Sequence, residues 1–77
     1  MADYQSIECG LHSQYELAIM HQQKITLRWQ DADKNIYDDT LLPIDLIAKD
    51  GEEFLIAKTN NGKQYKIRLD RILQHDL

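Results

Sequence analysis

A hairpin turn between two apolar segments sets the tightest limit on how this 77-residue chain can fold. The dipeptide Asn61-Gly62 favours a two-residue type I′ loop, because both residues tolerate positive φ. Such a loop fixes which residues of the flanking segments lie opposite one another, and the alternation of apolar residues supports the same register. The predicted buried face consists of two cross-strand pairs, Ile56 with Ile67 and Phe54 with Leu69.

A second alternating segment precedes this hairpin. In residues 25–30 apolar side chains occupy every other position, which predicts a strand with one buried face that includes Trp29. Residues 31–35 have the composition of a turn, and residues 35–41 are predicted to return as another strand. Because proline cannot donate to a strand ladder, we expect this strand to end at Pro43 or to lie at a sheet edge.

A capping box predicts one helix near the N-terminus. Ser13 and Glu16 have the S-x-x-E spacing, in which the serine accepts from first-turn amides and the glutamate reaches back to the serine amide. The helix is therefore predicted to start at Ser13 and to cover residues 14 to about 22. Its apolar side is predicted to contain Tyr15, Ala18 and Ile19, with Leu17 and Met20 extending the stripe.

Together these elements predict a single domain over residues 1–77, of the α+β class but mostly β. One N-terminal helix followed by four or five short antiparallel strands indicates a small bent antiparallel sheet or partly open barrel, capped by the helix. The state of residues 44–48 is left open, and Asp50-Gly51 is a turn signal. Residues 72–73 are a candidate for a last short strand.

The composition favours a soluble cytoplasmic protein. No apolar run approaches the roughly 20 residues needed to span a bilayer. The N-terminus lacks the basic and apolar stretches of a signal peptide. Cys9 is the single cysteine, which excludes an internal disulfide and fits a reducing compartment.

Motifs of common enzymes are absent from the sequence. It contains no Gly-rich phosphate loop, no H-E-x-x-H and no G-x-S-x-G. The three histidines are scattered, and a Cys9–His12 pair has no third group to orient it. We therefore expect no enzymatic activity, no metal and no cofactor.

Acidic and basic residues are segregated along the chain. No Lys or Arg precedes Lys24, and residues 38–53 hold six acids against one base, Lys49. The last third is basic, but the net charge of the chain is −4. A negative charge opposes the phosphate attraction that supplies most nucleic-acid affinity, whereas acid-rich segments suit a basic protein surface. We expect a protein partner, with no direct nucleic-acid binding and no membrane.

Two other interpretations stay open at the level of sequence. The hairpin 63–68 carries a tyrosine among three bases, and could form a stacking platform in a small Sm-like RNA-binding module: Lys63, Tyr65, Lys66 and Arg68. The same residues also fit a solvated strand face whose other side is core, which is the interpretation we favour. A structural or adaptor subunit of another complex is a third possibility that the sequence does not exclude.

Several short motifs occur in an order and spacing typical of a known family. Tyr4-Gln5-Ser6-Ile7-Glu8-Cys9 and then Glu16-Leu17-Ala18 correspond to the patterns Y-x-P-I-x-C and E-L-A. Asp45-Leu46 and Glu53-Phe54-Leu55 follow, and Arg68-Leu69-Asp70-Arg71-Ile72 is close to R-L-D-x-I. Over almost its whole length the chain thus resembles the Rho-binding antiterminators (Rof, also called YaeO), which inhibit Rho-dependent transcription termination.

The resemblance implies an Sm-like sheet preceded by a helix, and a protein that binds the N-terminal domain of the hexameric termination factor Rho. Binding there covers the primary RNA-binding site of Rho, and so blocks RNA loading and termination. It assigns partner binding to the segment before the helix and its first turn, with a loop as a second region: Glu8, Cys9, Gly10, His12, Ser13 and Glu16, then Lys49 and Asp50.

Two departures from the family pattern bear on this expectation. The family's proline is Ser6 here, which should loosen the N-terminal entry, and an acid common in the family is Ser13 here. Serine retains a cap hydrogen bond but carries no charge. Attraction to Rho should therefore weaken, unless Asp3, Glu8 or the second acidic region compensates.

Overall fold

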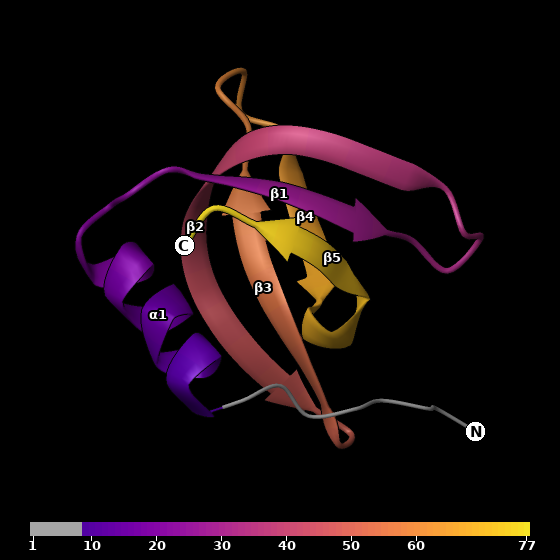
Figure 1. Ribbon diagram of the computed structural model, residues 1–77, viewed down its shortest axis with the longest axis horizontal. Helices are drawn as coiled ribbons and strands as arrows, with labels where there is room; N and C mark the ends of the chain where they lie inside the picture. Colours follow the sequence, from indigo (N-terminus) through magenta and orange to yellow (C-terminus); the bar gives the residue numbers. More distant parts are fainter. Residues whose placement is uncertain (1–8) are drawn as a thin grey trace.

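The computed structural model describes residues 9–77, which form one helix and five antiparallel strands (Figure 1). The sheet is open, with strand order β4-β3-β2-β1-β5. The predicted fold class, a bent and mostly β domain preceded by one N-terminal helix, is confirmed. The elements are α1 (Cys9–Met20), β1 (Ile25–Gln30), β2 (Ile36–Lys49), β3 (Glu52–Lys58), β4 (Gln64–Arg68), the 3₁₀ turn η1 (Leu69–Arg71) and β5 (Ile72–His75).

The long strand β2 bends the sheet, as its curved ribbon in Figure 1 shows. Its first part pairs with β1 and its second part pairs with β3, so the strand passes from one half of the sheet to the other. The strand therefore does not end at Pro43, and it lies between β3 and β1 and not at a sheet edge, so both predicted alternatives are wrong. The β2–β3 register shifts between Pro43 and Asp45, and such a bulge tolerates a residue without an N–H donor. The undecided residues 44–48 belong to this strand.

The β3–β4 hairpin differs by one residue from the predicted register. The Thr59 amide donates to the Lys63 carbonyl at 2.8 Å, and the Gly62 amide donates to the Thr59 carbonyl at 3.0 Å. With Gly62 at φ 89°, the loop has three residues instead of two. Leu55 now lies opposite Ile67.

This shift exchanges the two faces of β3. Leu55 and Ala57 are fully buried, whereas Phe54 and Ile56 are only partly buried. All four residues are apolar, so the alternation on this strand could not decide between the two registers. Ile67 and Leu69 are buried as predicted.

The helix begins four residues earlier than the capping box predicts. It starts at Cys9, so Ser13 lies inside it as an exposed residue and is not its N-cap. Glu16 does not reach back to Ser13, because its carboxylate contacts His12 one turn earlier. Tyr15 and Ala18 are buried as predicted, but Leu17 and Met20 are exposed.

One hydrophobic core fills the space between α1 and the curved sheet. Its ten buried residues come from the helix, from four strands and from η1, and Trp29 is among them, as predicted: Tyr15, Ala18, Ile25, Leu27, Trp29, Leu41, Leu55, Ala57, Ile67 and Leu69. Residues 72–75 form the predicted last strand. No helix among residues 9–77 is long and apolar enough to cross a membrane.

Tyr15 brings an unsatisfied hydroxyl into this core. The side chain is fully buried, and its hydroxyl has no hydrogen-bond partner among residues 9–77. We expect Tyr15→Phe to raise the free energy of unfolding by about 1 kcal/mol, because the substitution removes a buried polar group that lacks a partner. Chemical denaturation at neutral pH measures this change, and a loss of stability in the variant would contradict it.

The same residue predicts the alkaline behaviour of the fold. Burial raises the pKa of Tyr15 to about 12, above the ordinary value of 10.0. The unfolded chain therefore releases this proton at lower pH than the folded chain does. The wild type should lose stability between pH 10 and 12, and Tyr15→Phe should lose less over that range. Parallel losses in both proteins would contradict this assignment.

Candidate functional site

The outer side of α1 presents a stripe of four exposed residues. Ser13, Glu16, Leu17 and Met20 follow the i, i+3, i+4, i+7 spacing of one helix face. Leu17 is 50% exposed and Met20 is 73% exposed, although both are apolar. The stripe thus combines one carboxylate with two unburied apolar side chains on a rigid element.

His12 connects this helix to the start of β3. Its Nδ1 lies 3.3 Å from Oε1 of Glu16, and its Nε2 lies 3.2 Å from Oε2 of Glu53. Both ring nitrogens can donate to these carboxylates at once only in the imidazolium form. Glu16 remains more than half exposed, so its carboxylate is accessible to a partner.

The tight β2–β3 turn lies directly before Glu52, the first residue of β3 and the neighbour of Glu53. Asp50 and Gly51 both have positive φ, 54° and 79°, as a two-residue type I′ loop requires. The predicted turn is thus confirmed, and it leaves Lys49 and Asp50 exposed. Through the His12–Glu53 contact, this turn and the helix become parts of one surface, although they are far apart in the sequence.

We name this region the α1–turn surface and define it by the residues just described: His12, Ser13, Glu16, Leu17, Met20, Lys49, Asp50 and Glu53. It includes five of the eight predicted partner-binding residues. Of the other three, Glu8 lies outside the described residues, Cys9 is the first residue of α1, and Gly10 is exposed in the first helical turn.

Three members of the surface are not among the predicted partner-binding residues: Leu17, Met20 and Glu53, the last of which belongs to the acid-rich segment 38–53. The helical spacing of Leu17 and Met20 from Ser13 and Glu16 was visible, but both apolar residues were assigned to the core. Nothing in the sequence indicated that Glu53 would contact His12.

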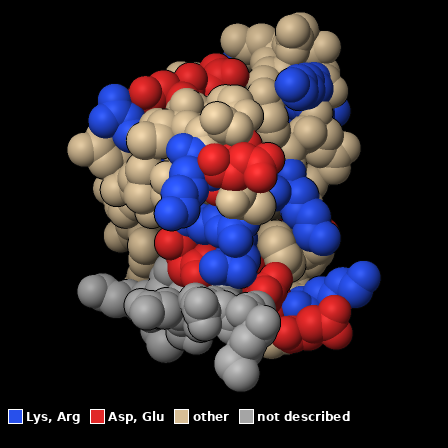
Figure 2. Space-filling model, turned by 90° about the vertical axis from the view of Figure 1, so that its right-hand side faces the viewer, with Lys and Arg blue, Asp and Glu red and all other residues tan. Residues whose placement is uncertain are grey.

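The basic hairpin does not form the continuous platform that the RNA-binding alternative requires. Arg68 is 13% exposed, and its guanidinium binds Asp70 through Nε at 2.6 Å and through Nη2 at 2.9 Å. A third contact joins its Nη1 to Glu52 at 3.3 Å. Figure 2 shows acidic and basic side chains side by side on the face at the right of Figure 1.

The two lysines of the hairpin lie over aromatic rings. Lys66 Nζ lies 4.4 Å from the ring centroid of Phe54, and Lys63 Nζ lies 5.0 Å from that of Tyr65.

Among residues 9–77, no group of three or more His, Cys, Asp or Glu side chains could hold a metal ion.

Comparison with known proteins supports the fold and assigns no family. No protein-family model and no curated protein matches this chain. Among solved structures, it is similar to part of Proteasome accessory factor B/C (PafBC) of Arthrobacter aurescens, with a TM-score of 0.75 and 19% sequence identity. The match covers 96% of this chain and 12% of that one, so the chain corresponds to a small part of that protein.

Proposed function

We propose that the α1–turn surface binds the N-terminal domain of Rho over its primary RNA-binding site, and that the protein thereby inhibits Rho-dependent termination. The observation that carries this proposal is the position of His12 between Glu16 and Glu53. It joins the helical region that the family resemblance assigns to partner binding to the strand that follows the second assigned region, the loop at Lys49 and Asp50, and it gathers carboxylates on one side of the domain.

The chemistry of the surface fits a basic protein partner. A site that holds RNA phosphates is rich in Lys and Arg, so it attracts carboxylates such as those of Glu16 and Asp50. The exposed Leu17 and Met20 add apolar contact area, which the centre of a protein interface needs. A surface that combines acidic and exposed apolar side chains matches the mixed composition of such interfaces.

A salt titration tests whether this attraction drives binding. We expect the affinity of the chain for the isolated N-terminal domain of Rho to fall steadily as salt rises from about 50 to about 500 mM, because ions screen exposed charges. Fluorescence anisotropy of labelled protein measures the dissociation constant at each concentration. An affinity that does not change with salt would contradict an interface built on the carboxylates.

RNA binding by the hairpin is the alternative function. The contacts of Arg68 with Glu52 and Asp70 count against it, since they neutralise one of the three bases of that hairpin. Filter binding to a pyrimidine-rich oligonucleotide separates the two functions. Appreciable binding by the protein alone would favour the alternative.

A further inference from the structure

A hollow of 380 Å³ lies between β1, the β1–β2 turn, β4 and η1, on a part of the molecule that shares no residue with the α1–turn surface. The curvature of the sheet creates it. β4 and β1 are not neighbours in the strand order, yet the Trp29 and Tyr65 ring centroids are only 5.3 Å apart. The volume lies within the range of small-molecule sites, roughly 300 to 1,000 Å³.

Aromatic rings form one wall of this hollow. Trp29 is 4% exposed and stacks on Tyr37, with centroids 5.6 Å apart and an interplanar angle of 25°. Tyr65 packs edge-on against Trp29 at 65°. Tyr37 is 38% exposed and Tyr65 is partly buried, so these two rings retain surface for a planar ligand.

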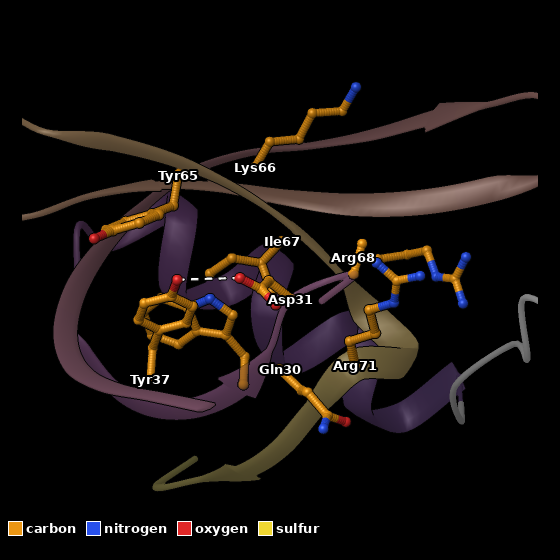
Figure 3. A pocket seen from close by; sticks show the side chains of 10 residues that line it. Gln30, Asp31, Tyr37, Tyr65, Lys66, Ile67, Arg68 and Arg71 are labelled. Carbon is orange, nitrogen blue, oxygen red and sulfur yellow. Dashed lines mark hydrogen bonds between the residues drawn. The ribbon is translucent and has the colours of Figure 1, made fainter. Parts of the chain in front are cut away.

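The β1–β2 turn holds the ring of Tyr37 in place. Tyr37 Oη donates to Asp31 Oδ2 at 3.1 Å, the interaction drawn as a dashed line in Figure 3. Asp31 also accepts from the backbone amides of Asn35 and Asp33, each at 2.9 Å. These hydrogen bonds lower the pKa of Asp31, and the bond from the Asn35 amide has the largest effect. The hydrogen bond to Asp31 in turn raises the pKa of Tyr37. A ring fixed in this way loses little freedom when a ligand stacks on it.

A cation lies across the hollow from the rings. In Figure 3 Arg71 lies on the side opposite Tyr37 and Tyr65, with Ile67 and Asp31 between them. Among residues 9–77 Arg71 forms no ion pair, unlike Arg68 beside it. A guanidinium of this kind binds phosphate through paired hydrogen bonds.

We propose that the hollow binds one nucleoside monophosphate, with the base against Tyr37 and Tyr65 and the phosphate on Arg71. The ligand needs a planar ring with polar edges and one anionic group, which matches the two walls of the site. The net charge of −4 disfavours a longer nucleic acid, and two other cations that line the hollow are already engaged: Arg68 is paired with Asp70, and Lys66 Nζ lies over the Phe54 ring.

The single tryptophan makes the test direct, because Trp29 lines the hollow. AMP and UMP should each change its fluorescence in a saturable way, with calorimetry confirming the affinity. Tyr37→Ala and Arg71→Gln should each weaken binding by about tenfold, from lost base stacking and lost phosphate contact. Lys58→Gln is the matched control, since it removes one exposed positive charge outside the hollow and should bind as the wild type does.

Circular dichroism establishes that each variant is folded. Two further probes test whether the phosphate contributes to binding and whether a longer nucleic acid is preferred. Uridine without phosphate should bind about tenfold more weakly than UMP, and a pentanucleotide should bind no more tightly than UMP. The proposal is overturned if neither mononucleotide binds at millimolar concentration, if the folded variants bind as the wild type does, or if uridine equals UMP. A pentanucleotide that binds far more tightly would replace it with RNA binding.

Discussion

Replacing Leu55 with alanine should lower the free energy of unfolding by about 2–5 kcal/mol, the cost of truncating a fully buried leucine. A domain of this size has total stability of only about 5 kcal/mol. Leu55→Ala should therefore be largely unfolded at moderate temperature. Thermal and denaturant unfolding followed by circular dichroism measures the loss.

Ile56→Ala is the matched control on the neighbouring position. Ile56 is partly buried on the other side of β3, so its truncation should cost only about 1 kcal/mol. The comparison tests the observed register of the β3–β4 hairpin against the one that a two-residue loop would impose. If Ile56→Ala were as damaging as Leu55→Ala, or more so, the two-residue loop would be the correct one.

The contrast between Leu55 and Ile56 shows which features of the fold the sequence could predict and which it could not. The alternation in residues 25–30, the Asp50-Gly51 turn and the helix-then-strands order were sufficient to predict the fold class. The hairpin register was not determined, because residues 54–57 are all apolar and Asn60-Asn61-Gly62 is compatible with loops of either length. Contacts between residues that are distant in sequence determine which face of β3 is buried.

The predicted start of the helix is wrong because a local motif does not determine where a helix begins. The S-x-x-E spacing of Ser13 and Glu16 describes a helix start, but it occurs equally well inside a helix that begins at Cys9. The candidate site was predicted as two separate regions. The two regions form one surface because His12 of the helix contacts Glu53 of β3. The bend of β2 and the turn after it place Glu53 beside the helix.

Reversing two charges on the α1–turn surface should have the largest effect on partner binding. We expect the double variant Glu16→Lys, Glu53→Lys to bind the N-terminal domain of Rho on the order of 100-fold more weakly, since each lysine would face a basic surface. The corresponding glutamine variant should lose only about tenfold, because it removes attraction without adding repulsion. Calorimetric titration measures both affinities.

A control with the same change in net charge separates local contact from overall charge. Asp33 and Asp39 are exposed carboxylates of the β1–β2 hairpin, outside the α1–turn surface. The variant Asp33→Lys, Asp39→Lys should bind Rho nearly as the wild type does. Equal losses in the two lysine variants would mean that net charge, and not this surface, governs binding.

Competition with RNA tests the proposed function most directly. The labelled protein is bound to the N-terminal domain of Rho and titrated with a pyrimidine-rich oligonucleotide, while anisotropy reports the bound fraction. If the carboxylates occupy the RNA-binding site, the oligonucleotide releases the protein, and the apparent dissociation constant rises linearly with the concentration of free RNA. A ternary complex, in which saturating RNA leaves the protein bound with unchanged affinity, would contradict the proposal.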